Sequence, residues 1–172
     1  MPMRMVILIA ALLAVYGGFA SAQAADTSDA ANYCKAVGNI DAPDKAYAGP
    51  AVPAWMIKAL YTKQEIEAQT QAGVDPARAV VWRCMGGKIW ACVQGNAPIC
   101  GNANQDKTPT QAMREFCASQ PNAEAIPLVV IGHDHPMVYD WTCKGKQPTI
   151  AKQIFTVDAR GFPAELWKTI AP

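Results

Sequence analysis

The chain has 172 residues, with 15 Lys or Arg against 14 Asp or Glu, so its net charge is close to zero. This balance lacks the basic patch of a protein that binds nucleic acid or an anionic membrane surface, and we expect neither partner. The length suits one globular domain with a core of its own.

The first 24 residues have the pattern of a secretory signal peptide. Arg4 precedes an apolar run over residues 5–15, and small residues then end in Ala22-Gln23-Ala24, a typical cleavage pattern. The run is shorter than the roughly 20 residues that cross a bilayer, so we expect no transmembrane anchor. We predict a leader over 1–24, a disordered segment over 25–32 and a single globular domain over 33–172, located in the periplasm or secreted.

Six cysteines follow the predicted leader: Cys34, Cys84, Cys92, Cys100, Cys117 and Cys143. Their even number and the oxidising compartment predict three disulfides and no free thiol. No C-x2-C pair occurs, so zinc ribbons and thioredoxin-like redox motifs have little support.

Local patterns predict the first elements. Residues 37–53 form a Gly- and Pro-rich loop, followed by a helix over 54–60. A second helix begins after Thr62, which forms a capping box with Glu65, and ends at Gly73. Its interior is mostly polar, so we expect it to lie on the surface.

A β-hairpin is predicted over residues 79–93, with Gly86-Gly87 as its two-residue turn. In this register Cys84 faces Ile89, while Cys92 faces Val81. The two cysteines then lie on opposite faces of the hairpin and cannot bond to each other.

The next predicted element is a short helix with Thr108 as its N-cap and Pro109 in its first turn, ending near Cys117. Cys100 lies in the loop before this helix, so we favour a Cys100–Cys117 bridge. Without a Cys84–Cys92 bond, two pairings of the other four cysteines stay open.

Strands are predicted over 128–131, 137–143, 149–157 and 162–168, with Pro163 confining the last one to an edge. The predicted fold class is therefore α+β: a single disulfide-stapled antiparallel β-sheet domain with two or three peripheral short helices. Residues 82–86 and 141–145 share the pattern W-x-C-x-G. We interpret it as a strand that ends in a turn, because two copies of five residues are too few for a repeat architecture.

Residue scarcity argues against an enzyme. Beyond the leader the only serines are Ser28 and Ser119, and neither lies in a catalytic motif. The cysteines are assigned to bridges and no phosphate-binding loop occurs, so we name no catalytic residue. A carboxylate-dependent hydrolase stays an alternative, although no pair of acids stands out.

The two histidines lie in Gly132-His133-Asp134-His135-Pro136-Met137. If this segment is extended, His133, His135 and Met137 project from one side, a ligand set that suits copper. A polar turn with solvated histidines is the favoured interpretation, and we expect no other cofactor.

Tryptophans serve both cores and binding surfaces, and most of the five in this chain lie in predicted strands, where a core role is simpler. Trp55 and Trp90 are the candidates for a binding interface.

The W-x-C-x-G strands, the cysteine-rich hairpin and residues 157–162 resemble an uncharacterised family of small exported bacterial cysteine-containing proteins. That resemblance covers Cys34 to the end and implies no known activity. The strands are also similar to those of periplasmic lysozyme inhibitors, whose serine-glycine inhibitory loop has no counterpart here, so no inhibitory residue is carried over.

We therefore expect an exported, disulfide-stabilised binding or interaction protein, with an inhibitor of an extracytoplasmic hydrolase as one form of this function. Its partner would be another exported protein or a cell-envelope component. A periplasmic copper-binding protein is the alternative.

Overall fold

The computed structural model describes residues 26–94, 99–132 and 134–172, so the predicted leader lies outside the described residues. The elements in chain order are α1 (Ala30–Val37), α2 (Ala54–Leu60), α3 (Lys63–Gln71), the 3-10 helix η1 (Pro76–Ala79), β1 (Val80–Met85), β2 (Lys88–Val93), α4 (Gln111–Ser119), α5 (Leu128–Ile131), β3 (Tyr139–Lys144), β4 (Gln147–Gln153), the 3-10 helix η2 (Ala164–Leu166) and β5 (Lys168–Ile170). None of the helices in these three ranges is long and apolar enough to cross a membrane.

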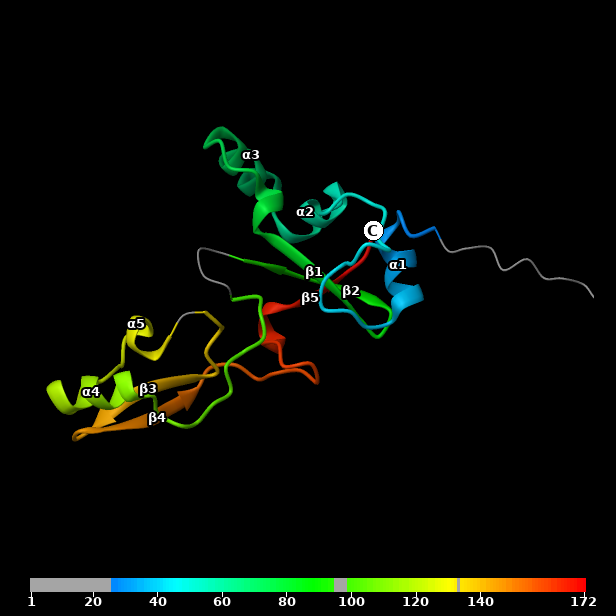
Figure 1. The fold of residues 1–172 in the computed structure, drawn as a ribbon. Coiled ribbons are helices and arrows are strands. Elements are labelled where there is room, and N and C mark those ends of the chain that lie inside the picture. The colour runs from blue at the N-terminus through cyan, green and yellow to red at the C-terminus, as the bar shows by residue number, and fades with distance from the viewer. Residues whose placement is uncertain (1–25, 95–98, 133) are drawn as a thin grey trace, which may run out of the picture.

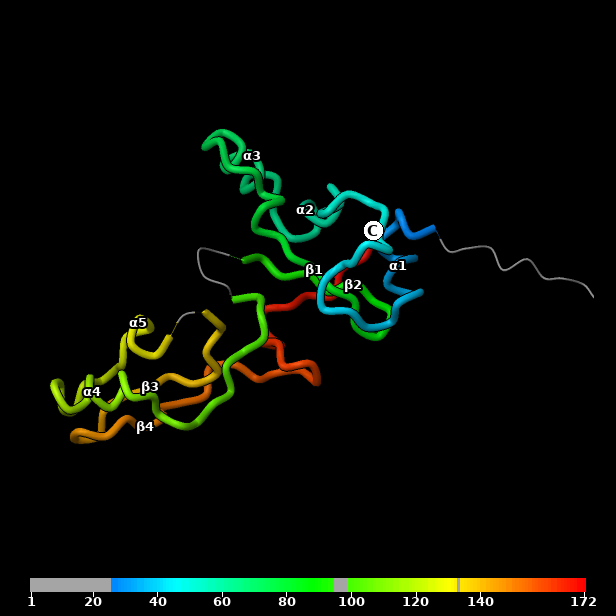
Figure 2. Tube along the Cα trace, viewed as in Figure 1, coloured from blue at the N-terminus to red at the C-terminus, as the bar shows by residue number. Residues whose placement is uncertain are grey.

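The predicted α+β class is confirmed, with the antiparallel strands arranged in two sheets (Figure 1). One sheet has the order β1-β2-β5, and the other consists of β3 and β4. The Cα trace in Figure 2 shows α1, α2 and α3 around the first sheet, and α4 and α5 beside the second. The C-terminal strand β5 returns to the first sheet, so it lies in the same half as α1.

The β1–β2 hairpin has the predicted register. Cys84 pairs with Ile89 and Cys92 with Val81 across the strands, and both turn glycines have positive φ. Successive side chains of a strand point to opposite faces of the sheet, and here other segments cover both faces. On one face Trp82 and Cys84 pack with α1 and α2, whereas on the other Cys92 packs with the C-terminal segment.

All six cysteines are paired, as predicted, and there is no Cys84–Cys92 bond. The favoured Cys100–Cys117 bridge is wrong. The observed pairs are Cys34–Cys84, Cys92–Cys100 and Cys117–Cys143. Cys117 lies on the face of α4 that packs against the β3–β4 hairpin, because its helix is amphipathic, and this face brings it to Cys143.

The helices α2 and α3 match the sequence prediction, including the Thr62–Glu65 capping box. The cap of α4 does not: it is Thr110 rather than Thr108, because the Thr110 hydroxyl accepts a hydrogen bond from the backbone N–H of Met113. Residues 30–32, predicted as disordered, form the first turn of α1, which Asp29 caps.

Two predicted strands take other forms. Residues 128–131 form the short helix α5, because Pro127 starts a helical turn and only Ile131 of the run is buried. Residues 162–168 split into η2 and a later strand, since Pro163 lacks the N–H that a ladder needs. The strand β4 also begins two residues earlier than predicted and ends at Gln153, before the chain turns to residues 154–157.

The same arrangement of a helix and a hairpin occurs twice in the chain. In the first unit (α1, α2, β1, β2) a disulfide joins Cys34 of α1 to Cys84 of β1. In the second unit (α4, α5, β3, β4) a disulfide joins Cys117 of α4 to Cys143 of β3. In both units a short helix with a proline N-cap precedes the hairpin.

The hydrogen bonds at the two turns also correspond. Asn39 and Asn122 each stand five residues after the helix cysteine of their unit. The side-chain Oδ1 of Asn39 accepts from the backbone N–H of Gly86 at 2.8 Å, and that of Asn122 accepts from Gly145 at 2.8 Å. The shared W-x-C-x-G pattern is therefore the most visible part of a longer repeated unit, which corrects the view that it reflects only a strand and a turn.

Among the described residues one charged side chain is fully buried: Arg83, on the face of β1 that the C-terminal segment covers. Its Nη2 donates to the carboxylate of Asp158. Its guanidinium carbon lies 4.0 Å from the ring centroid of Phe162 and 4.4 Å from that of Trp167. Because a buried charge is costly unless paired, this contact holds residues 158–167 against the sheet.

The carboxylate of Asp158 is held by several donors. Burial raises its pKa, but hydrogen bonds from Arg83 and from the backbone N–H groups of Phe162 and Arg160 more than offset this, so the pKa lies below 3.8. A second ion pair lies beside this contact: Arg160 Nη2 donates to the Asp41 carboxylate at 2.7 Å. The C-terminal turn is thereby tied to the loop after α1.

The first prediction concerns the two asparagines. Asn39→Ala and Asn122→Ala should each lower the free energy of unfolding by about 1 kcal/mol, because each leaves one turn N–H without its acceptor. Urea unfolding measures the change, and Asn32→Ala, an exposed position of α1, is the control. A large loss in one variant with none in the other would contradict the equivalence of the units.

The second prediction concerns Asp158. Asp158→Asn leaves Arg83 buried without a counter-charge and should cost about 3–5 kcal/mol. Because the folded-state pKa of Asp158 is depressed, its contribution is present above pH ~4 and disappears as the pH falls through the lower folded value. Unfolding measured between neutral and acidic pH should therefore show a smaller acid dependence in the variant. An equal acid dependence would show that Asp158 is not the responsible group.

Candidate functional site

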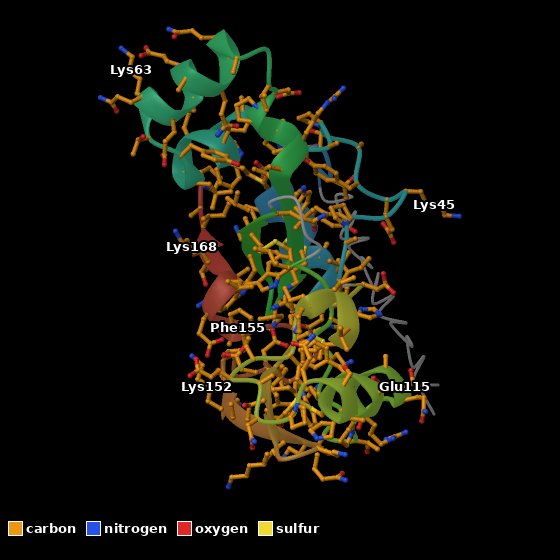
Figure 3. The ribbon with its side chains drawn as sticks, turned by 90° about the vertical axis from the view of Figure 1, so that its left-hand side faces the viewer. Lys45, Lys63, Glu115, Lys152, Phe155 and Lys168 are labelled. Atoms are coloured by element: carbon orange, nitrogen blue, oxygen red, sulfur yellow. A yellow bond between two sulfur atoms is a disulfide. The ribbon has the colours of Figure 1, made fainter. Side chains whose placement is uncertain are left out.

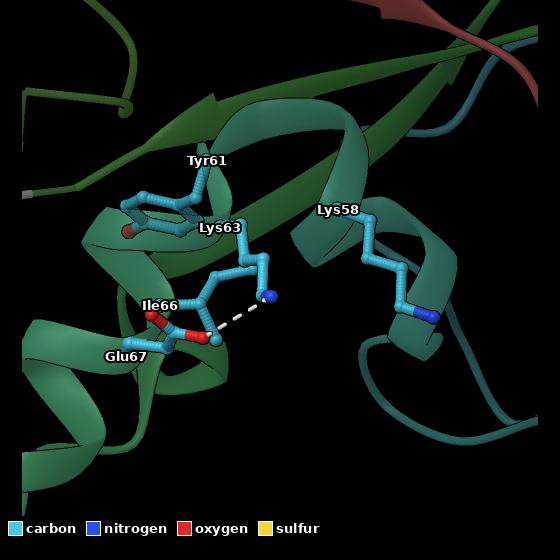
Figure 4. Close-up of a pocket in the computed structure, with 5 residues that line it drawn as sticks. All are labelled: Lys58, Tyr61, Lys63, Ile66 and Glu67. Carbon is cyan, nitrogen blue, oxygen red and sulfur yellow. Dashed lines mark ion pairs between the residues drawn. The ribbon is translucent and has the colours of Figure 1, made fainter.

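A groove lies between α2 and α3 on the first unit (Figure 4). Its volume is about 520 Å³, and five residues line it: Lys58, Tyr61, Lys63, Ile66 and Glu67. The figure shows Lys58 extending from α2 on one side and the other four side chains gathered on the opposite side. We call this cavity the α2–α3 groove.

The position of α3 follows from its local sequence. Thr62 and Glu65 satisfy the first amides of the helix, and Gly73 takes the positive φ that ends it. None of its residues is buried, so α3 adds nothing to the hydrophobic core. Together with α2, α3 forms the groove.

The second unit lacks this element. There α5 runs through Gly132 and residues 134–138 to β3 without a helix that corresponds to α3. The helix with its cysteine, the short proline-capped helix and the hairpin recur in both units, whereas α3 and the following η1 occur in the first unit. An element that the scaffold does not require and that encloses a cavity is the strongest candidate for a functional surface.

Of the two lysines at the groove, Lys63 has an ion-pair partner and Lys58 has none among the described residues. Lys63 Nζ lies 3.6 Å from Glu67 Oε1, and both side chains are well exposed. Lys58 makes no ion pair among the described residues. Figure 3 shows Lys63 on α3 and Lys168 on β5 projecting from the same side of the molecule.

The two tryptophans predicted for an interface do not form one surface. Trp55 packs at the edge of the cluster between α1, α2 and the sheet. Trp90 packs on the opposite face of that sheet, beside Phe162 and Trp167. Both are half-buried, which places them mainly in the core.

The predicted copper ligands are separated where the structure describes them. His135 is exposed in a bend, whereas Met137 is buried and forms a bridge with Asn104. His133 lies outside the described residues. Met137 instead lines a cavity of about 20 Å³ with Met113 and Asp106, among other residues.

That small cavity has the size of a single water molecule. It lies at the N-terminus of α4 and is also lined by Trp141, whose buried indole N–H has no partner among the described residues. Both features favour an electron-rich acceptor such as a water oxygen over a cation. Across residues 26–94, 99–132 and 134–172, no group of three or more His, Cys, Asp or Glu could hold a metal ion.

Two carboxylates do lie close enough to interact. A hydrogen bond from Arg160 lowers the pKa of Asp41 below its usual value, although burial and, to a smaller extent, the charge of Asp158 act in the opposite direction. The pKa of Asp158 is also lowered, after the opposing effect of burial. A glycosidic general acid needs a raised pKa, so this pair does not suit that role.

The comparisons with known proteins leave the site to be argued from its geometry. The chain matches no protein-family model, no curated protein and no solved structure.

The groove residues were not singled out from the sequence. One signal was present: Ile66 is the single large apolar side chain in the otherwise polar and surface-exposed α3. An apolar residue on a helix that has no core face indicates a contact outside the core.

The third prediction tests the copper hypothesis. If the His-Asp-His segment binds copper, His133→Ala with His135→Ala should abolish binding and leave the melting temperature unchanged, because the disulfide-braced sheets do not depend on this turn. Stoichiometric copper in protein purified without chelators would support the hypothesis. The same melting temperature with and without Cu(II) would contradict it.

Proposed function

We propose that the protein is an exported, disulfide-stabilised binding protein that acts in the periplasm or outside the cell. Three disulfides support this location, because they form and persist in oxidising compartments. The predicted signal peptide supports it as well.

The observation that carries the binding function is the α2–α3 groove. Its second wall, α3, buries no side chain and has no counterpart in the second unit. The volume of about 520 Å³ lies within the range of pockets that hold small ligands. We therefore propose the groove as the surface through which the protein contacts its ligand, which is presented by another exported protein or a cell-envelope component.

A non-enzymatic role fits the chemistry of the groove. Its titratable side chains are two lysines, one tyrosine and one glutamate, and Glu67 is paired with Lys63. No nucleophile with an adjacent base is among them. Inhibition of an extracytoplasmic hydrolase is one form that such binding could take, with the groove receiving part of the enzyme surface.

The fourth prediction tests the groove by blocking it. Ile66→Lys should reduce capture of the ligand from a periplasmic or secreted extract at least tenfold, and it should not unfold the protein, because α3 contributes no core residue. Ile154→Lys, which changes an exposed apolar residue far from the groove, is the matched control.

Capture that is equal with Ile66→Lys and the wild-type protein would place the contact surface elsewhere. Turnover of a substrate by the purified protein, without any captured ligand, would overturn the binding function itself.

A further inference from the structure

The α2–α3 groove also indicates the chemistry of what it binds, on the basis of the proposed function. Its walls combine two kinds of surface. The Tyr61 ring and the Ile66 side chain are half-buried and supply apolar contact, while Lys58 and Lys63 are exposed beside them. A ligand that fills this cavity therefore meets an apolar wall and a charged rim.

The charge on that rim is positive. The Lys63–Glu67 pair is neutral as a unit, which leaves Lys58 as the charge without a partner among the described residues. Lys58 stands in the last turn of α2, where the helix dipole favours a cation. A ligand anion can neutralise it without displacing any existing partner.

The carboxylate of Glu65 in α3 already has hydrogen-bond donors. The pKa of Glu65 is lowered, first by hydrogen bonds from the Thr62 backbone and hydroxyl and further by the positive charge of Lys168. Its carboxylate accepts from the Thr62 N–H at 2.7 Å and from the hydroxyl at 2.8 Å. Glu65 therefore acts as the cap of α3 and does not compete with a ligand for Lys58.

Tyr61 presents a neutral phenol to the groove. Burial raises its pKa above 10, a hydrogen bond with Gln69 acts in the opposite direction, and the charge of Glu65 raises it further. The ring therefore adds no negative charge that would repel an anion. Its face and the Ile66 side chain form the apolar wall.

We propose that the groove binds an amphipathic anion. An aromatic or aliphatic body packs against the wall formed by Tyr61 and Ile66, and a single acid group pairs with Lys58. The group is a carboxylate or a sulfonate-like acid, and the ligand is of small-molecule size because the cavity holds about 520 Å³.

The fifth prediction uses two probes of similar shape on the full mature protein. Anilinonaphthalene sulfonate carries one negative charge, whereas phenylnaphthylamine is its uncharged analogue. Fluorescence titration should show that the anionic probe binds with at least tenfold higher affinity. Its affinity should fall about tenfold with Lys58→Glu, because reversing one exposed charge replaces an attraction by a repulsion.

The matched control is Lys35→Glu, since Lys35 is the basic residue in the last turn of α1 and lies outside the groove. It should bind the anionic probe as the wild-type protein does. Added salt should weaken the binding of the anion and leave that of the neutral probe unchanged.

Equal affinity for the two probes, or equal losses with Lys58→Glu and Lys35→Glu, would overturn the inference. The proposed function fails separately: if Ile66→Lys loses the captured ligand while Lys58→Glu retains it, the groove is the binding surface but its ligand is not an anion. If neither variant affects capture, the groove is not the surface.

Discussion

The disulfide between a helix and the first strand of a hairpin is the constraint on which both halves of the protein depend. A two-stranded hairpin is marginal by itself, and here a disulfide fixes each one to the helix that covers its apolar face. The Cys34–Cys84 bond spans 50 residues and Cys117–Cys143 spans 26, so each removes much of the freedom of the unfolded chain. The asparagine that accepts from the turn glycine forms a second link between the segment after the helix and the hairpin.

The two units differ at the residue between Trp and Cys in the W-x-C-x-G pattern. In the second unit this residue is Thr142, whose hydroxyl donates to the Ala123 carbonyl at 2.7 Å within the unit. In the first unit it is Arg83, which is too long and too polar to be satisfied by its own unit. The guanidinium needs Asp158 and two aromatic rings, and this requirement brings the C-terminal segment back over the first sheet. The Arg83 contacts thus hold the last residues over the first sheet, together with the pairing of β5 with β2.

Local chemistry decided which features could be predicted from the sequence. Gly86-Gly87 permits one tight turn, so the hairpin and its register followed, and the Thr62–Glu65 box located the start of α3. The predicted Cys100–Cys117 bridge was wrong, because closeness in the sequence does not show which face of α4 packs against the β3–β4 hairpin. The α2–α3 groove could not be predicted in this way either, because it depends on the angle between two helices. Ile66 is the one residue in the sequence that indicated it.

The separation of α3 from the core bears on how the groove behaves. A nine-residue helix is marginal in water, and this one is held by its capping box, the Lys63–Glu67 pair and contacts with η1 in place of buried side chains. The opposite wall, α2, is anchored by the fully buried Met56. One wall is therefore firm and the other has low local stability. A ligand of the proposed kind, which touches Tyr61 and Ile66 while it pairs with Lys58, would contact both walls, so its binding would stabilise α3 against α2.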